Sequence, residues 1–122
     1  MYFTERELTA MAKMAGVMAL ADGRGDAREA ALIARELTSL SNGYNTENVV
    51  KAADRMEVDE SLRILRSLTN EEKKYVCGFL AAIVQADNNI SDSEIKAWQV
   101  VCSLAAFPTM TFAEAVGFWA TH

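Results

Sequence analysis

The sequence contains the same helix-turn-helix pattern twice, and this repetition constrains the fold more than any other feature. The first copy turns at residues 21–29 and the second at residues 86–94. Asp22 and Asp87 open the two turns and stand 65 positions apart, as do Glu29 and Glu94. In each copy the glutamate stands three positions after an N-cap residue, which is the spacing of a capping box. We therefore expect two matched helical hairpins.

The repetition extends along both halves of the chain. Thr4-Glu5-Arg6-Glu7 and Thr69-Asn70-Glu71-Glu72 are capping boxes in the same 65-residue register. Thr111-Phe112-Ala113-Glu114 opens a last helix in the same way, with Thr46 as its counterpart. The apolar residues of the first helix follow helical spacing and have apolar partners 65 positions later. These are Met11, Met14, Ala15 and Met18, matched by Val76, Phe79, Leu80 and Ile83.

The pattern predicts an all-α fold, a compact bundle of about seven helices built from two pseudo-symmetric halves. A left-handed Gly43 ends the second helix, Asp59 caps a short linking helix, and Pro108 separates the last two helices. No stretch alternates with period two for long enough to propose a strand. We expect a single domain over 1–122, with half-repeats at about 4–57 and 69–122. The predicted helices are 4–21, 26–42, 46–57, 59–67, 70–87, 91–106 and 111–121.

Composition and charge restrict the classes of function. The formal net charge is −5, and no cluster of basic residues stands out, so nucleic acid is not expected as a partner. The charged start of the chain lacks the apolar region of a signal peptide. The longest apolar stretches are far too short to cross a bilayer, so no membrane insertion is expected. We expect a cytoplasmic protein.

Two cysteines, Cys77 and Cys102, stand in the middle of predicted helices at apolar positions. We interpret them as buried free thiols, which pack as small hydrophobic side chains. A disulfide or a metal pair is the alternative, and the absence of a CxxC spacing speaks against it.

The two turns carry carboxylates, which are ligands that suit Ca²⁺ or Mg²⁺. A standard EF-hand is excluded in the second turn, because Asp92 stands where the loop needs glycine and Trp98 where it needs glutamate. The same acidic residues are also explained as helix caps and Asx turns, without any metal. The candidate metal ligands are Asp22, Asp26, Glu29, Asp87, Asp92 and Glu94.

The turns resemble the signature of a known family. The segment Ala21-Asp22-Gly23 to Glu29 and its second copy, Ala86-Asp87 to Glu94, are similar to motifs of the tellurite-resistance TerB-like family and of the N-terminal domain of DjlA-type co-chaperones. The resemblance implies a bacterial all-α domain with acidic residues that coordinate a metal, in stress-response or adaptor proteins. The chain departs from the motif at Asn88, which replaces a glycine, and at Arg24, which adds a positive charge.

These observations favour a non-catalytic, cation-binding or adaptor module. Catalysis is not expected, because the single histidine is His122, the last residue, and no phosphate loop or nucleophile elbow is present. The alternative is a module that binds an unknown protein partner or forms a homodimer, in which the acidic residues only cap helices. Its candidate surface is aromatic and comprises Tyr2, Phe3, Phe112, Phe118 and Trp119.

Overall fold

Helices connected by short segments make up the chain in the computed structural model, which describes residues 2–20, 27–40, 43–86 and 90–122. For residues 27–31 only the backbone is described. Within these ranges there are seven α-helices and no strand, as the sequence predicts. The helices are α1 (Glu5–Ala19), α2 (Ala27–Leu40), α3 (Thr46–Arg55), α4 (Val58–Arg66), α5 (Asn70–Gln85), α6 (Asp92–Leu104) and α7 (Phe112–Ala120).

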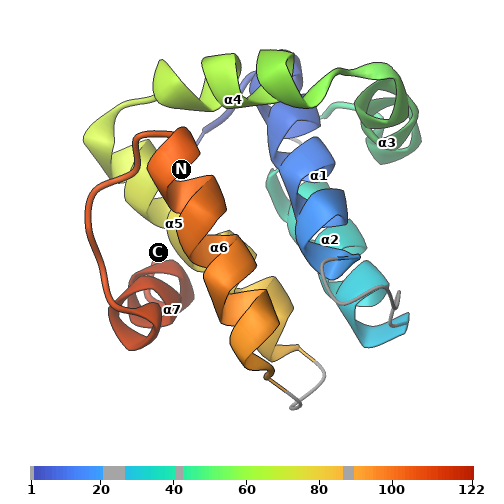
Figure 1. The fold of residues 1–122 in the computed structure, drawn as a ribbon. Helices are drawn as coiled ribbons and strands as arrows, with labels where there is room; N and C mark the ends of the chain where they lie inside the picture. The colour runs from blue at the N-terminus through green and yellow to red at the C-terminus, as the bar shows by residue number, and fades with distance from the viewer. Residues whose placement is uncertain (1, 21–26, 41–42, 87–89) are drawn as a thin grey trace.

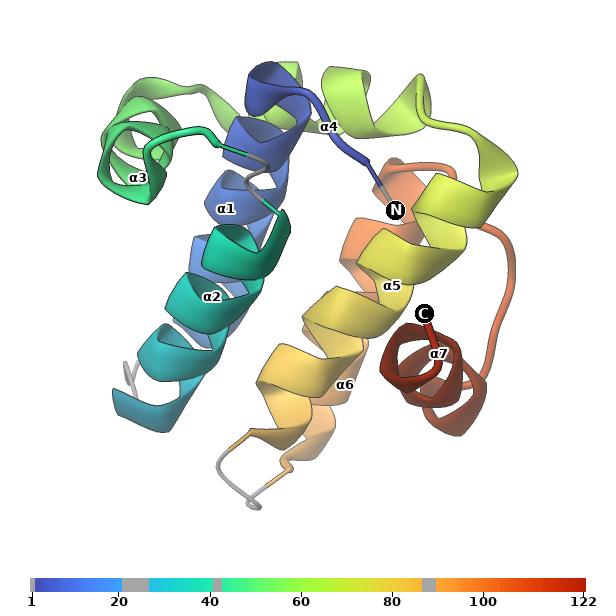
Figure 2. The ribbon, with the colours of Figure 1, turned by 180° about the vertical axis from the view of Figure 1, so that it is seen from behind.

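Two helical pairs stand side by side and are joined at one end by α4. Figure 1 shows α1 with α2 on one side and α5 with α6 on the other, with α4 across the end of both. The view from behind shows the same arrangement, with α3 beside α1 and α7 beside α5 (Figure 2). The linking helix therefore connects two halves of similar design.

The observed helices keep the register of the sequence repeat. α1 begins at Glu5 and α5 at Asn70, while α2 begins at Ala27 and α6 at Asp92. Both pairs of helix starts are 65 positions apart. The capping boxes predicted at Thr4 and Thr69 are formed in full.

Two predicted caps are wrong. Thr46 is the first residue of α3, and Asn45 is its N-cap, with a side-chain oxygen that accepts a hydrogen bond from the Asn48 amide at 3.2 Å. Asparagine is at least as good a cap as threonine, so the neighbour one position earlier takes the role. Asp59 does not cap α4, because the chain is already extended at Glu57 and enters the helix at Val58. Asp59 lies in the first turn of α4 instead, where its negative charge interacts favourably with the helix dipole.

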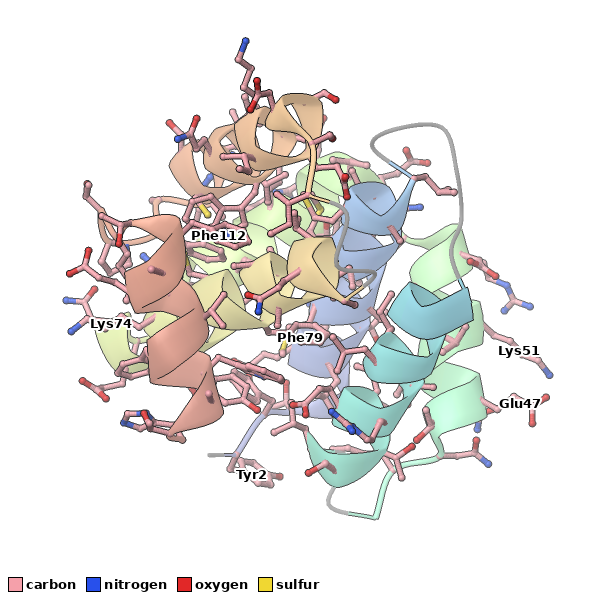
Figure 3. The ribbon with its side chains drawn as sticks, turned by 90° about the horizontal axis from the view of Figure 1, so that it is seen from below. Tyr2, Glu47, Lys51, Lys74, Phe79 and Phe112 are labelled. Atoms are coloured by element: carbon pink, nitrogen blue, oxygen red, sulfur yellow. The ribbon has the colours of Figure 1, made fainter. Side chains whose placement is uncertain are left out.

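The core lies between the two halves and takes apolar side chains from both. Met11, Met14 and Met18 of α1 are buried, as are Phe79 and the other predicted core residues of α5. Figure 3 shows Phe79 directed into the middle of the bundle, whereas Glu47 and Lys51 of α3 point away from it. The predicted buried faces of α1 and α5 are confirmed.

The end of α6 is a Schellman motif formed without glycine. The amide of Phe107 donates to the carbonyl oxygen of Cys102 at 2.9 Å, and that of Ala106 donates to Ser103 at 3.1 Å. Ala106 has a φ of 57°, in the left-handed region. The predicted left-handed conformation of Gly43 is confirmed by its φ of 97°. Its predicted role in ending the second helix involves residues 41–42, which lie outside the described ranges. These hydrogen bonds position the segment that contains Phe107 and Pro108 beside α6.

None of the helices in the described ranges combines the length and the apolar character needed to cross a bilayer.

Candidate functional site

The second of the two predicted acidic turns, residues 86–94, lies directly before α6. The structure describes it except for residues 87–89. Ser91 is the N-cap of α6, and its hydroxyl accepts a hydrogen bond from the Glu94 amide at 3.2 Å. Oε1 of Glu94 accepts in return from the Ser91 amide at 3.2 Å and from the Ser91 hydroxyl at 3.0 Å. The predicted capping box at this position is confirmed.

Glu94 differs from the other capping glutamates in its burial. Glu94 is only 2% exposed, whereas Glu7 and Glu72 are partly exposed and Glu114 is exposed. All four glutamates form the same reciprocal hydrogen bonds with their N-cap residues. Capping therefore does not require a buried carboxylate, and the burial of Glu94 needs a separate explanation.

The remaining predicted metal ligands are placed only in part. Asp92 is exposed in the first turn of α6, two residues before Glu94. The other four predicted ligands lie outside the residues whose side chains are described. Among the described side chains, no three of His, Cys, Asp or Glu are grouped so that they could hold a metal ion. The four undescribed ligands are Asp22, Asp26, Glu29 and Asp87.

The aromatic residues proposed as a protein-binding surface are mostly engaged inside the bundle. Phe3 is fully buried, which corrects its assignment to that surface. Phe112 packs edge-to-face on Trp98 with ring centroids 5.4 Å apart, and Phe118 and Trp119 are half-buried against the core. Of this set, Tyr2 is the residue that remains exposed, at 56%.

A carboxylate links three helices near these aromatic rings. Oε2 of Glu36 on α2 accepts hydrogen bonds from the Tyr75 hydroxyl at 3.0 Å and from the Trp119 indole nitrogen at 3.2 Å. Burial, followed by the negative charge of Glu36, raises the pKa of Tyr75. Trp119 is therefore a structural contact between α7 and α2.

The two cysteines face each other across the α5–α6 pair. The Sγ atoms of Cys77 and Cys102 lie 3.4 Å apart, and both thiols are free. Cys77 is buried as predicted, while Cys102 is partly exposed. Sequence reasoning missed the contact between them. The available signal was their position on consecutive antiparallel helices at comparable distances from the connecting turn, rather than a CxxC spacing.

A cavity of about 360 Å³ adjoins this thiol pair. Trp98 lines it and donates its indole hydrogen bond to the carbonyl oxygen of Cys77 at 3.0 Å. The segment after α6 contributes Phe107, Pro108 and Met110. The cavity therefore exists because the Schellman turn positions that segment beside α6.

Comparison with solved structures finds matching chains, and one of them is similar in both fold and sequence. A protein of unknown function, PG1108 from Porphyromonas gingivalis W83, has a crystal structure that aligns with a TM-score of 0.83 and 34% sequence identity. The alignment covers 98% of this chain and 92% of that one. Neither a family model nor a curated protein matches the sequence.

Proposed function

This chain belongs to the same family as the Porphyromonas gingivalis protein of unknown function, and we propose that it is a non-catalytic TerB-like domain that binds a divalent cation. The ion, Ca²⁺ or Mg²⁺, binds at the junction between α5 and α6, in a bacterial stress-response or adaptor role. The family relationship itself carries no function, because the Porphyromonas gingivalis protein is one of unknown function.

The burial of Glu94 is the observation that supports cation binding. A buried carboxylate is costly unless an opposite charge or enough hydrogen bonds compensate for it. Among the described side chains, no lysine or arginine forms an ion pair with Glu94. In the same part of the chain, both groups that donate to its carboxylate belong to Ser91, and both hydrogen bonds end on Oε1. A cation bound to the other oxygen would compensate the charge.

The chemistry of the neighbouring residues is consistent with such an ion. Asp92 is close in the chain, and Asp87 opens the same turn, so carboxylate oxygens from both sides of the junction are available. Hard oxygen ligands favour Ca²⁺ and Mg²⁺ over softer metals. Because the sequence pattern is repeated, the turn at residues 21–29, with Asp22, Asp26 and Glu29, would hold a second cation in the same way.

Thermal unfolding with millimolar Ca²⁺ or Mg²⁺ tests this proposal. A cation that binds only the folded chain raises its stability, by about 2.7 kcal/mol when its concentration is a hundred times the dissociation constant. Glu94→Gln should abolish the gain, because glutamine retains the capping hydrogen bond but loses the charge. Glu114→Gln is the matched control, since it alters an exposed capping box and should leave the gain intact.

The result that contradicts the proposal is an unchanged melting temperature in the wild type with either ion. An equal loss of the gain in Glu114→Gln would also contradict it, because the effect would then be general electrostatics rather than a site at Glu94.

A specific observation favours a protein-interaction module as the second candidate. Val100 and Leu104, one helical turn apart on α6, are 56% and 49% exposed. Neighbouring exposed apolar side chains on one helix face gain free energy when a partner covers them, so this pair is where a contact would form. Sedimentation velocity of the wild type and of a Val100→Ser, Leu104→Ser variant distinguishes this candidate. It requires a wild-type dimer that the variant loses.

A further inference from the structure

The strongest feature outside the acidic junction is the pair of thiols between α5 and α6. Their Sγ atoms are 3.4 Å apart, and a disulfide bond is about 2.05 Å long, so the two sulfurs must approach by about 1.4 Å to bond. A change of rotamer at either cysteine moves its sulfur and changes this separation. Both backbones are held, because the carbonyl oxygen of Cys77 accepts from Trp98 and that of Cys102 accepts from Phe107.

The two thiols are chemically unequal. The hydrogen bond from the Cys102 thiol lowers the pKa of Cys77, although burial of Cys77 acts in the opposite direction. The same hydrogen bond and burial raise the pKa of Cys102. Both thiols line the cavity, so an oxidant can reach either sulfur, and the lowered pKa favours Cys77 for the first attack because the thiolate is the reactive form.

The adjoining cavity gives a small oxidant a route to the pair. It is lined by both cysteines, and Cys102 is partly exposed. The remaining described residues of its wall, including Trp98, Phe107 and Met110, carry no charge. An uncharged reagent is therefore better suited to this cavity than an anionic one.

We propose that Cys77 and Cys102 form a redox-active dithiol, which a peroxide converts into an intramolecular disulfide between α5 and α6. The thiolate of Cys77 attacks one oxygen of hydrogen peroxide, so the O–O bond breaks, Cys77 becomes a sulfenic acid and hydroxide leaves. A proton converts the hydroxide to water. The sulfur of Cys102 then attacks the sulfur of Cys77, the S–O bond breaks, and the thiol proton of Cys102 leaves with the hydroxyl group as water. In total, two thiols and one peroxide yield one disulfide and two waters.

Native mass spectrometry and thiol titration after stoichiometric hydrogen peroxide test this inference. The folded wild type should lose both free thiols and a mass equal to two hydrogens, and a digest should contain the peptides of Cys77 and Cys102 linked together. Dithiothreitol should restore both thiols. The oxidised chain should melt at a higher temperature, because the cross-link restricts the unfolded chain.

Single substitutions assign the two roles. In Cys102→Ser the nucleophile remains but its partner is lost, so the chain should gain one oxygen and react with a sulfenic-acid probe such as dimedone. In Cys77→Ser the hydrogen bond to the Cys77 thiol is lost, but burial still raises the pKa of Cys102, so the remaining thiol should react more slowly than Cys77 does in Cys102→Ser. Both variants replace sulfur by oxygen at similar size, and circular dichroism verifies that they fold.

Three outcomes would overturn the inference. The first is independent oxidation of each cysteine without a link, and the second is disulfide-linked dimers as the main product. The third is a disulfide that forms only when urea unfolds the chain. None of these outcomes affects the cation proposal, because it depends on Glu94 and not on the two thiols.

Discussion

Gly78 of α5 lies directly against the backbone carbonyl of Ala115 on α7, with no space for a methyl group between them. A Cβ atom at position 78 would overlap the carbonyl oxygen of Ala115 and would stand 2.6 Å from the Cβ of Trp119. α7 packs more extensively on α5 than α3 packs on α1. The first half has Lys13 at the position that matches Gly78. The two halves have matching helices, but α7 approaches α5 more closely than α3 approaches α1.

Gly78→Ala should destabilise the fold by about 1–3 kcal/mol, because a methyl group forced into a packed interface displaces its neighbours. This loss should outweigh the preference of a helix interior for alanine over glycine. The free energy of unfolding in urea measures it. Gly117→Ala is the control on the facing helix, since nothing lies within 4 Å of a Cβ there, and it should stabilise by roughly 0.5–1 kcal/mol. Equal stability of the two variants would contradict the close approach of α5 and α7.

Ala106→Gly should stabilise the protein by about 0.5–1 kcal/mol. This is the difference between the strain that glycine relieves in the folded chain and the conformational entropy that it adds to the unfolded chain. Ala106 has a φ of 57°, and a left-handed conformation is unfavourable for a residue with a Cβ atom. The hydrogen bonds of the Schellman motif remain, because they use backbone atoms. Thermal and urea unfolding measure the change. Gly43→Ala, at the other positive φ in the described residues, should have the opposite sign.

Tyr75→Phe should reduce the loss of stability at alkaline pH. Burial and the charge of Glu36 raise the pKa of Tyr75 in the folded state, whereas an unfolded tyrosine ionises near pH about 10. The folded chain therefore keeps this proton longer than the unfolded chain. Its contribution to stability is complete below about pH 10 and falls above it, by about 1.4 kcal/mol per pH unit for one proton.

The measurement is the free energy of unfolding of the wild type and of Tyr75→Phe, from neutral to alkaline pH. The difference between the two curves reports the Tyr75 proton, because the other titrating groups contribute equally to both proteins. The wild-type curve should fall more steeply above about pH 10. Parallel curves would show that Tyr75 ionises in the folded state as readily as in the unfolded one.

Much of the fold follows from local patterns in the sequence. Capping boxes at Thr4, Thr69, Ser91 and Thr111 were predicted and are formed, because a cap depends on residues three positions apart. The errors at Thr46 and Asp59 arose where several residues compete for one helix start. Local spacing alone does not decide such a competition: Asn45 caps at least as well as Thr46, and the chain already enters α4 at Val58.

The candidate site is predicted less completely. The sequence marked Glu94 as one of six candidate acidic residues, and only the packing of the second pair makes it buried. It also placed Phe3 on a surface, although Phe3 closes the core and packs on Tyr75 with ring centroids 6.0 Å apart. Burial depends on neighbours that are distant in the chain, and a single sequence does not display those neighbours.

By itself, the sequence determined the all-helical class, the positions of the helices and the 65-residue register of the two halves. These depend on interactions within about one helical turn, which the order of residues contains directly. The tertiary structure alone decided that Cys77 meets Cys102, that Gly78 receives α7, and that Glu36 joins Tyr75 to Trp119. Such contacts depend on the distance and orientation between whole helices, which are set by the packing of the entire core.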